Sequence, residues 1–231
     1  MPDTVPNTLP FVALLVAGGS GTRMNSAVPK QFMHLGRKPL LLHTMDAFIK
    51  AYPTIRFVIV LPQEHREKGE DIVRTSFPML PVTFATGGAT RFESVKNGLD
   101  QVSDGHLVFV HDAVRCLIST ELIKRCAEAA IHYGSAVPAI AAKDSIRICD
   151  AQGNNHMIDR RLVRMVQTPQ VFESKALKTV FASPYQSSFT DEATVWEAFG
   201  NTVHLVEGEE RNIKITHPSD LNIAEEWLAR I

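Results

Sequence analysis

Three glycines and two cations near the N-terminus are the first residues whose types and spacing suggest chemistry. In the segment LLVAGGSGTRMNSAVPKQF (14–32), Gly18, Gly19 and Gly21 follow an apolar run, and Arg23 and Lys30 come after them. Glycine lets a backbone turn sharply or approach a ligand closely. Because the segment contains no acidic residue to pair with the two cations, we expect an anion to bind here, first of all a phosphate.

Two well-known phosphate-binding loops do not account for these glycines. A dinucleotide fingerprint requires G-x-G-x-x-G, but Met24 stands where the third glycine would be. The P-loop pattern G-x-x-x-x-G-K-[ST] is also absent from the sequence. One interpretation is a long loop whose backbone amides and cations surround a triphosphate. The other is a surface loop with unremarkable charges.

A second glycine pair stands before a predicted helix. In ATGGATRFESVKNGL (85–99), Gly88 follows a strand, and Arg91 and Ser94 lie at the helix start. A nucleobase edge needs close backbone approach and a few directed hydrogen-bonding groups, which these residues supply. Thr90 and Glu93 also have the spacing of a capping box, and the two roles are compatible.

A third group of polar residues ends an apolar strand. In VFVHDAVRC (108–116), the predicted strand is apolar on both faces until it reaches His111 and Asp112. A carboxylate at the ligand-binding end of a sheet can orient a hydroxyl or help to position Mg²⁺, and Arg115 can bind a phosphate. The alternative is that Asp112 caps the next element. One aspartate does not indicate zinc, and we expect no dedicated metal site in the protein, with Mg²⁺ held mainly by phosphates.

Smaller motifs follow in the second half of the chain. Lys214 stands between Ile213 and Ile215 in NIKIT (212–216), so on an alternating strand its side chain would point away from theirs and into the site. A solvent-facing lysine on an edge strand is the alternative. The motif TDEA (190–193) is expected to cap a helix and to have no further role.

Strands and helices that alternate along the chain would position these residues. The predicted strands are 11–17, 57–62, 82–86, 106–112 and 136–142. The predicted helices are 40–51, 63–75, 91–101 and 119–133, followed by 173–182, 191–199 and a closing helix from 218. Further strands are expected near 203–206 and 212–216. We therefore expect an α/β protein with a mostly parallel sheet and helices on both faces, in one domain spanning 1–231 with a two-stranded excursion at about 143–166.

The charges of the whole chain nearly cancel, so an anion site must be local. Of 231 residues, 24 are Lys or Arg and 25 are Asp or Glu, giving a formal net charge of −1. This balance provides no overall field to attract nucleic acid or an anionic membrane, and we expect neither partner. The apolar run 11–17 is too short for a membrane span, and the residues before it lack the basic charge of a signal peptide.

The cysteines indicate a reducing compartment. They stand at 116, 126 and 149, form no C-x-x-C pair and leave an odd number. This arrangement argues against a disulfide framework and against a structural zinc site. We therefore expect the protein to be cytoplasmic.

The ordered motifs resemble those of a known family. They are AGGSGTRM…PKQF, GGATR…SV, VHDAVR, KDSI, DR…TPQ, TDEA and NIKIT. This series, from about residue 11 to 226, resembles the 2-C-methyl-D-erythritol 4-phosphate cytidylyltransferases. The resemblance implies a Rossmann-like nucleotidyltransferase fold and the transfer of CMP from CTP to methylerythritol phosphate, with release of pyrophosphate, in non-mevalonate isoprenoid biosynthesis. It also implies Mg²⁺ and a homodimer formed through a β-arm, which matches the excursion at 143–166.

The resemblance also implies roles for single residues at the nucleotide end of the site. Those that would hold cytosine and ribose are Ala17, Gly18, Gly19, Gly88 and Ser94. Arg91 would support their loop, and Arg23 and Lys30 would bind the triphosphate and stabilise charge on the phosphorus under attack.

At the acceptor end, the implied residues come from two subunits. Asp112, Arg115 and Lys214 would surround the sugar phosphate and the reacting centre. Arg160 and Thr168 would reach the acceptor phosphate from the neighbouring subunit, and Ser145 would supply a hydroxyl to the acceptor where other members often have Thr.

Two alternatives remain open at this point. A ribitol-5-phosphate cytidylyltransferase would share the CTP loop and differ mainly in its acceptor, a polyol phosphate of similar size. A nucleotide-sugar binding module or glycosyltransferase would use a similar sheet, but such enzymes commonly carry a D-x-D motif, and no second acid follows Asp112 in HDAV.

Overall fold

Alternating side chains in the first strand explain how one sheet acquires helices on both faces. In β1 (Phe11–Val16), Ala13 and Leu15 join one hydrophobic cluster, whereas Val12 and Leu14 join another on the opposite face. Both faces of this strand are therefore buried, as in a parallel sheet covered on two sides. The computed structural model describes residues 9–18 and 28–229.

The described residues form the following elements. The strands are β1, β2 (His34–Leu35), β3 (Lys38–Pro39), β4 (Arg56–Leu61), β5 (Val82–Thr86), β6 (Leu107–Asp112), β7 (Ser135–Ala141), β8 (Ile146–Cys149), β9 (Asn155–Ile158), β10 (Arg164–Val166), β11 (Gln170–Glu173) and β12 (Leu205–Glu207). The α-helices are α1 (Leu40–Ala51), α2 (Arg66–Ser76), α3 (Arg91–Leu99), α4 (Thr120–Tyr133), α5 (Ser174–Phe181), α6 (Glu192–Ala198) and α7 (Pro218–Leu228). Short 3₁₀ turns are η2 (Lys30–Phe32), η3 (Gln63–His65) and η4 (Arg160–Leu162).

The main sheet has the order β10-β7-β11-β6-β1-β4-β5, and β12 also pairs with β7. The pairs among β6, β1, β4 and β5 are parallel, whereas β11 runs antiparallel to both of its neighbours. The chain proceeds from β1 outward to β5 and then returns to β6 on the other side of β1. In open α/β sheets, ligands bind at such a reversal, beyond the carboxyl ends of the strands.

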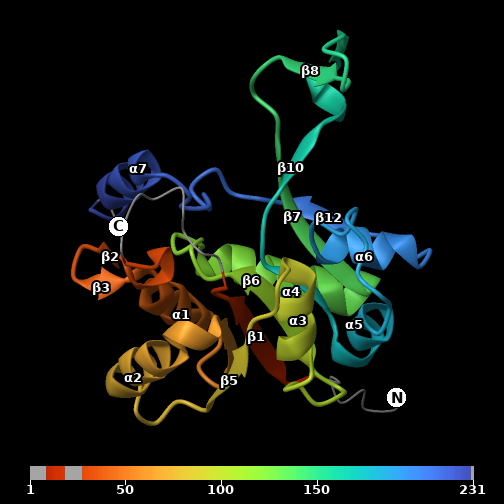
Figure 1. The fold of residues 1–231 in the computed structure, drawn as a ribbon. Helices are drawn as coiled ribbons and strands as arrows, with labels where there is room; N and C mark the ends of the chain where they lie inside the picture. Colours follow the sequence, from red (N-terminus) through yellow and green to blue (C-terminus); the bar gives the residue numbers. More distant parts are fainter. Residues whose placement is uncertain (1–8, 19–27, 230–231) are drawn as a thin grey trace, which may run out of the picture.

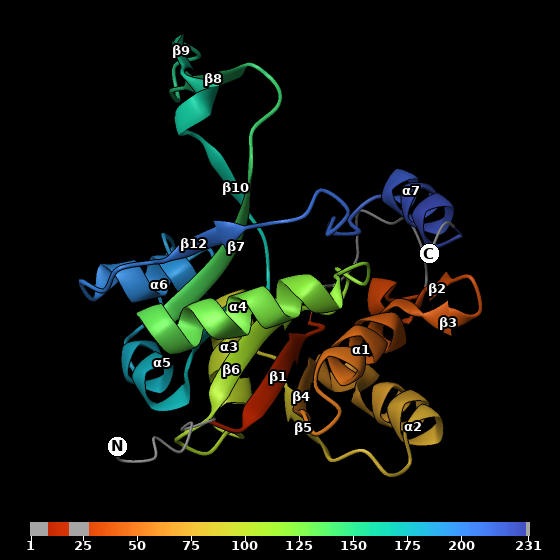
Figure 2. The ribbon, with the colours of Figure 1, turned by 180° about the vertical axis from the view of Figure 1, so that it is seen from behind.

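Helices cover both faces of the sheet, as Figures 1 and 2 show from opposite sides. Side chains of α1, α2 and α4 pack into one cluster, and those of α3, α5 and α6 pack into the other. Leu221, Trp227 and Leu228 of α7 pack on a smaller cluster that includes Leu35 and Ile215. The predicted α/β architecture is confirmed.

An arm projects from the body between β7 and β10 (Figures 1 and 2). At its end, β8 and β9 pair in antiparallel register from Ile146–Ile158 to Cys149–Asn155. The predicted two-stranded excursion is therefore confirmed. No helix in the part of the chain that the structure describes is long and apolar enough to cross a bilayer.

One expected strand is absent, and one observed strand was not predicted. Residues 212–216 are not a strand, although Ile215 N donates to the Val114 carbonyl at 3.2 Å. Conversely, β11 lies in the middle of the sheet, where Val171 and Phe172 are fully buried between β6 and β7. The sheet is thus mostly parallel, as expected, with antiparallel pairing at β11.

Candidate active site

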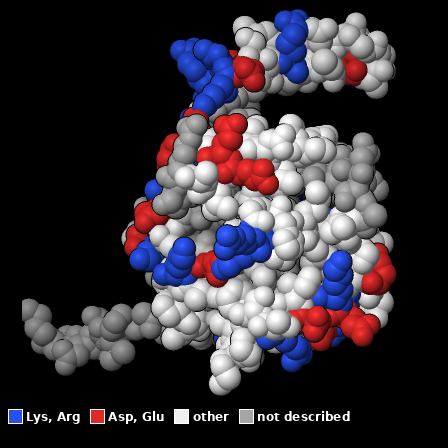
Figure 3. Space-filling model, turned by 90° about the vertical axis from the view of Figure 1, so that its left-hand side faces the viewer, with Lys and Arg blue, Asp and Glu red and all other residues white. Residues whose placement is uncertain are grey.

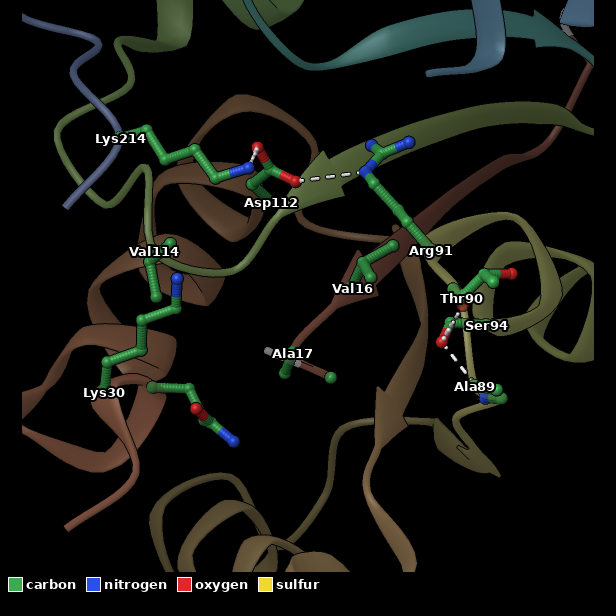
Figure 4. Close-up of a pocket in the computed structure, with 13 residues that line it drawn as sticks. Val16, Ala17, Lys30, Ala89, Thr90, Arg91, Ser94, Asp112, Val114 and Lys214 are labelled. Atoms are coloured by element: carbon green, nitrogen blue, oxygen red, sulfur yellow. Dashed lines mark hydrogen bonds and ion pairs between the residues drawn. The ribbon is translucent and has the colours of Figure 1, made fainter. Parts of the chain in front are cut away.

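A pocket of about 370 Å³ opens beyond the carboxyl ends of β1, β5 and β6. Figure 4 shows Lys30 on one side of it, Ser94 on the other and Ala17 between them. Its described lining consists of Val16, Ala17, Gly18, Lys30, Gln31, Gly88, Ala89, Thr90, Arg91, Ser94, Asp112, Val114 and Lys214. The volume is in the range of sites for small ligands.

The start of α3 holds one wall of this pocket rigidly. Thr90 accepts from Glu93 N, and the Glu93 carboxylate accepts from Thr90 N, so the predicted capping box is confirmed. Ser94 Oγ accepts from Gly88 N at 3.1 Å and donates to the Thr90 carbonyl at 2.9 Å. A Cβ on Gly88 would lie 2.3 Å from Glu93 Cβ, so this position requires glycine.

Asp112 joins the pocket to a group of three cations. Its Oδ2 lies 3.0 Å from Lys214 Nζ and 3.4 Å from Arg115 Nε, and its Oδ1 lies 3.6 Å from Arg91 Nε. Figure 4 shows Lys214 and Arg91 reaching this carboxylate from opposite sides. Each partner comes from a different part of the chain, and the carboxylate is nearly enclosed.

The protonation states of this cluster follow from burial and pairing. Burial alone would raise the pKa of Asp112, but Arg91, Lys214 and Arg115 together hold it well below the ordinary value. Burial opposes the charge of Arg91, yet its acidic partners, Glu192 and Asp112, raise its pKa above the usual range. Asp112 is therefore an anion and Arg91 a cation at neutral pH.

His111 and Thr168 support Asp112 from beneath. His111 Nε2 lies 3.2 Å from the Arg115 carbonyl and therefore carries the proton, which leaves Nδ1 to accept from the Thr168 hydroxyl at 3.0 Å. Thr168 Oγ1 in turn accepts from Asp112 N at 3.1 Å. Burial lowers the pKa of His111 to about 4, so its ring is neutral at pH 7.

A loop before α7 delivers Lys214. Asn212 is fully buried, and its Nδ2 donates to the Thr168 carbonyl at 2.9 Å. Arg115 Nη1 donates to the Asn212 carbonyl at 2.8 Å, and Gln167 Nε2 donates to the Glu209 carbonyl at 2.7 Å. Although this segment is not a strand, Lys214 does point away from buried Ile215 and into the pocket, as its alternation predicts.

Glu192 is a site residue that the sequence analysis missed. Asp191 caps α6, as expected for TDEA, but Glu192 is fully buried and binds both terminal nitrogens of Arg91. The motif therefore does more than cap a helix. The sequence did contain one indication of this role. Asp191 and Thr194 complete the capping box, so capping does not explain the acidic residue at 192.

The structure brings most of the predicted site residues together but places four apart from the pocket. Ser145 is exposed on the arm, as is Arg160, whose Nη1 donates to the Lys143 carbonyl at 2.5 Å. Arg115 pairs with Asp112 and does not line the pocket, and Thr168 is buried with its hydroxyl engaged by His111 and by Asp112 N. Gly19 and Arg23 lie outside the described residues.

The described lining contains a single carboxylate, that of Asp112. Within residues 9–18 and 28–229, no three His, Cys, Asp or Glu side chains gather as a metal cage would require. Mg²⁺ is commonly held by one or two carboxylates together with substrate phosphates and water, and this donor set fits that mode.

Surface charge elsewhere is mixed. On the face shown in Figure 3, basic and acidic side chains are interspersed over the body, and further charges lie on the arm above it. This distribution agrees with the nearly balanced composition. Concentrated positive charge is a feature of the pocket and not of this whole face.

Comparisons with known proteins agree with this architecture over nearly the whole chain. The family model for 2-C-methyl-D-erythritol 4-phosphate cytidylyltransferase matches residues 11–230. Relatives of that name from Bacteroides thetaiotaomicron and Phocaeicola vulgatus are 41% and 42% identical, covering 91% and 92% of this chain and 95% and 96% of their own.

Solved structures give the same answer. The 4-diphosphocytidyl-2C-methyl-D-erythritol synthase of Anaerococcus prevotii superimposes with a TM-score of 0.82 at 27% identity, over 97% of this chain and all of its own. The Thermus thermophilus 2-C-methyl-D-erythritol 4-phosphate cytidylyltransferase superimposes with a TM-score of 0.74 at 32% identity, over 94% of this chain and 98% of its own. The chain therefore belongs to the 2-C-methyl-D-erythritol 4-phosphate cytidylyltransferase family.

Proposed function

We infer that this protein transfers the cytidylyl group of CTP to 2-C-methyl-D-erythritol 4-phosphate, giving CDP-methylerythritol and pyrophosphate in non-mevalonate isoprenoid biosynthesis. Family membership supplies the substrates. The observation that carries the chemistry is a pocket with bare backbone on one wall, Lys30 on another and Lys214 paired to Asp112 at its far end. These features suit a ligand with a planar base and several phosphates.

The reaction is an in-line displacement at phosphorus. A phosphate oxygen of the acceptor forms a bond to the α-phosphorus of CTP while the bond from that phosphorus to the bridging oxygen breaks, and pyrophosphate leaves with the electron pair. Both reactants are anions, so the protein must mainly neutralise charge and align the reacting atoms. The cations of the pocket serve this purpose, and no protein nucleophile is needed.

Each cation has a place in this scheme. Lys30 and Lys214 line the pocket and stabilise charge on the transferred phosphoryl group and on the acceptor phosphate, respectively. Asp112 holds Lys214 in position through the 3.0 Å ion pair. Arg23, outside the described residues, is assigned to the triphosphate on the family resemblance alone.

The base and ribose occupy the wall built from β1 and the start of α3. Ala17, Gly18 and Gly88 present backbone there, and Ser94 fixes Gly88 through its hydroxyl. Selectivity for cytosine then depends on main-chain groups whose positions are set by this packing. Gly19, outside the described residues, is assigned to the base and ribose on the family resemblance alone.

Magnesium is the proposed cofactor. When bound by the triphosphate it neutralises the charge of the leaving pyrophosphate. Asp112 is the described pocket carboxylate that would complete its coordination or orient its water shell. The residues of the protein orient the nucleotide, and the arrangement does not require a protein-only metal cage.

A homodimer formed through the arm is also proposed. Met157 and Leu162 on the arm are 68% and 78% exposed. A second copy of the chain would cover such apolar side chains. In that assembly Ser145 and Arg160 of one subunit would approach the acceptor in the other.

We propose a cytoplasmic location on the chemistry of the thiols. Cys116 and Cys126 are buried without a disulfide, and burial raises the pKa of each to about 12. Cys149 is exposed and unbridged. Reduced thiols of this kind are typical of proteins in a reducing compartment.

The test is a pyrophosphate-release assay with purified protein, CTP, Mg²⁺ and methylerythritol phosphate. Pyrophosphate and CDP-methylerythritol are expected in equal amounts, and a Lys30→Ala protein serves as the matched inactive control. Ribitol 5-phosphate in a parallel reaction tests the sibling activity. Faster turnover with ribitol phosphate, or no turnover with either acceptor, would contradict the proposed function.

A further inference from the structure

Glu192 is a fully buried carboxylate beneath the reaction centre. Three hydrogen bonds at the start of α6 hold it there. Asp191 caps α6 by accepting from Thr194 N at 2.9 Å. Gln170 of β11 donates to Asp191 Oδ2 and accepts from Ala193 N, both at 2.8 Å. The start of α6 is therefore fixed to the central sheet, and the position of Glu192 is fixed with it.

Glu192 occupies both terminal nitrogens of Arg91. Arg91 Nη1 donates to Oε1 in a short contact, and Nη2 donates to Oε2 at 3.1 Å. Only Nε is left to face Asp112, at 3.6 Å from Oδ1. Arg91 therefore does not contact Asp112 Oδ2, which pairs with Lys214 at 3.0 Å and with Arg115 Nε at 3.4 Å.

This order of charges has a physical reason. A guanidinium binds a carboxylate through two parallel hydrogen bonds and is a stronger partner than an ammonium. Without Glu192, the fork of Arg91 would turn to Asp112 and compete with Lys214 for both carboxylate oxygens. The loss of the Glu192 carboxylate would also leave the cluster of Arg91, Asp112, Arg115 and Lys214 with a second net positive charge that no anion offsets.

We propose that Glu192 is a positioning residue for cytidylyl transfer: by holding the fork of Arg91, it reserves Asp112 for Lys214 and so sets where Lys214 meets the acceptor phosphate. The inference rests on the proposed function. It assigns Glu192 no contact with either substrate, because Glu192 acts through Arg91 and Asp112. Burial raises the pKa of Glu192, and the Arg91 guanidinium beside it offsets part of that rise.

Glu192→Gln tests the proposal, because it keeps the size of the side chain and removes its charge. Displacing Lys214 should lower kcat about 10- to 100-fold, while the KM for CTP changes much less. In a double-mutant cycle, Glu192→Gln should lower kcat almost no further when Lys214→Gln is already present, because Lys214 is the group through which Glu192 acts. Losses that multiply would overturn the proposal.

Two control variants on the same helix separate positioning from stability. Val195→Ala removes a buried apolar side chain and should lower the unfolding midpoint but not kcat. Glu197→Gln lies on the exposed side and should change neither. A kcat loss in Val195→Ala equal to that in Glu192→Gln would contradict a positioning role.

Two further outcomes are distinguishable. If the wild-type protein releases no pyrophosphate, the proposed function fails; if it does and Glu192→Gln has the wild-type kcat, only the positioning role fails. Should Glu192→Gln not fold, the cycle is run with Glu192→Asp, whose shorter side chain releases at least one terminal nitrogen of Arg91. The same kcat loss and the same absence of a further loss with Lys214→Gln are then expected, and a wild-type kcat or multiplying losses would overturn the proposal.

Discussion

Mild acid should destabilise this protein through one buried ring. His111 is fully enclosed at the end of β6, and its ring packs edge to face with Phe48, the two ring centroids being 5.3 Å apart. Its nitrogens are committed to the Arg115 carbonyl and the Thr168 hydroxyl. Protonation at Nδ1 would turn that acceptor into a donor inside an apolar enclosure, and burial accordingly lowers the pKa of His111 to about 4.

The magnitude follows from proton linkage. In the unfolded chain a histidine takes up its proton near pH 6.5, whereas the folded protein keeps His111 neutral down to about pH 4. The contribution of His111 to the free energy of unfolding is therefore complete above pH 6.5, declines as the pH falls from there to about 4, and stays lost below. Between pH 7 and pH 5 the loss amounts to about 2 kcal/mol.

Urea unfolding at pH 7, 6 and 5 measures this loss, and His111→Gln isolates it. Glutamine does not titrate, and its amide can still donate to the Arg115 carbonyl. The variant will be less stable at pH 7, but the difference between wild type and variant should shrink by about 2 kcal/mol on going to pH 5. A difference that stays constant over this range, with equal m-values, would refute the assignment of the pH dependence to His111.

Four other outcomes are expected. Lys30→Ala and Lys214→Ala should each lower kcat about a hundredfold with unchanged circular dichroism, and near-normal turnover in both would contradict the electrostatic mechanism. Gly88→Ala should raise the KM for CTP, since the new methyl group must displace the pocket wall packed on Glu93; an unchanged KM would contradict that placement. Chelation with EDTA should stop turnover and added Mg²⁺ restore it, whereas persistent turnover would exclude the proposed cofactor. Mixed dimers of Lys30→Ala and Arg160→Ala subunits, confirmed by mass spectrometry, should regain activity, and no recovery would count against a site shared through the arm.

The ends of the parallel strands could be predicted from sequence because local signals agree there. The apolar runs of two strands stop at Ala17 and Asp112, and a glycine pair that includes Gly88 follows a third strand. The end of each strand can therefore be read from its own residues. The rule that ligands bind at these carboxyl ends then brings the three motifs to one place. The pocket confirms that convergence.

Other features depend on contacts between distant segments and leave little local trace. The strand β11 is only four residues long and follows Pro169, so nothing in QVFE separates it from a turn or from the helix that follows. Lys214 has the alternation of a strand, but its segment is held by buried Asn212 through side-chain hydrogen bonds instead of a ladder. Glu192 looks like a helix-start acid until its partner Arg91 is known.

The pairing of Arg91 with Glu192 spans 101 positions of the chain, and Lys214 arrives later still. During synthesis, β1 and the start of α3, which form the nucleotide wall, are made early. The cations around Asp112 are complete only when the loop that carries Lys214 has docked. A polypeptide that terminates before that loop would leave Asp112 without Lys214. The proposed transfer therefore requires translation at least through Lys214, because the earlier part of the chain lacks this counter-charge.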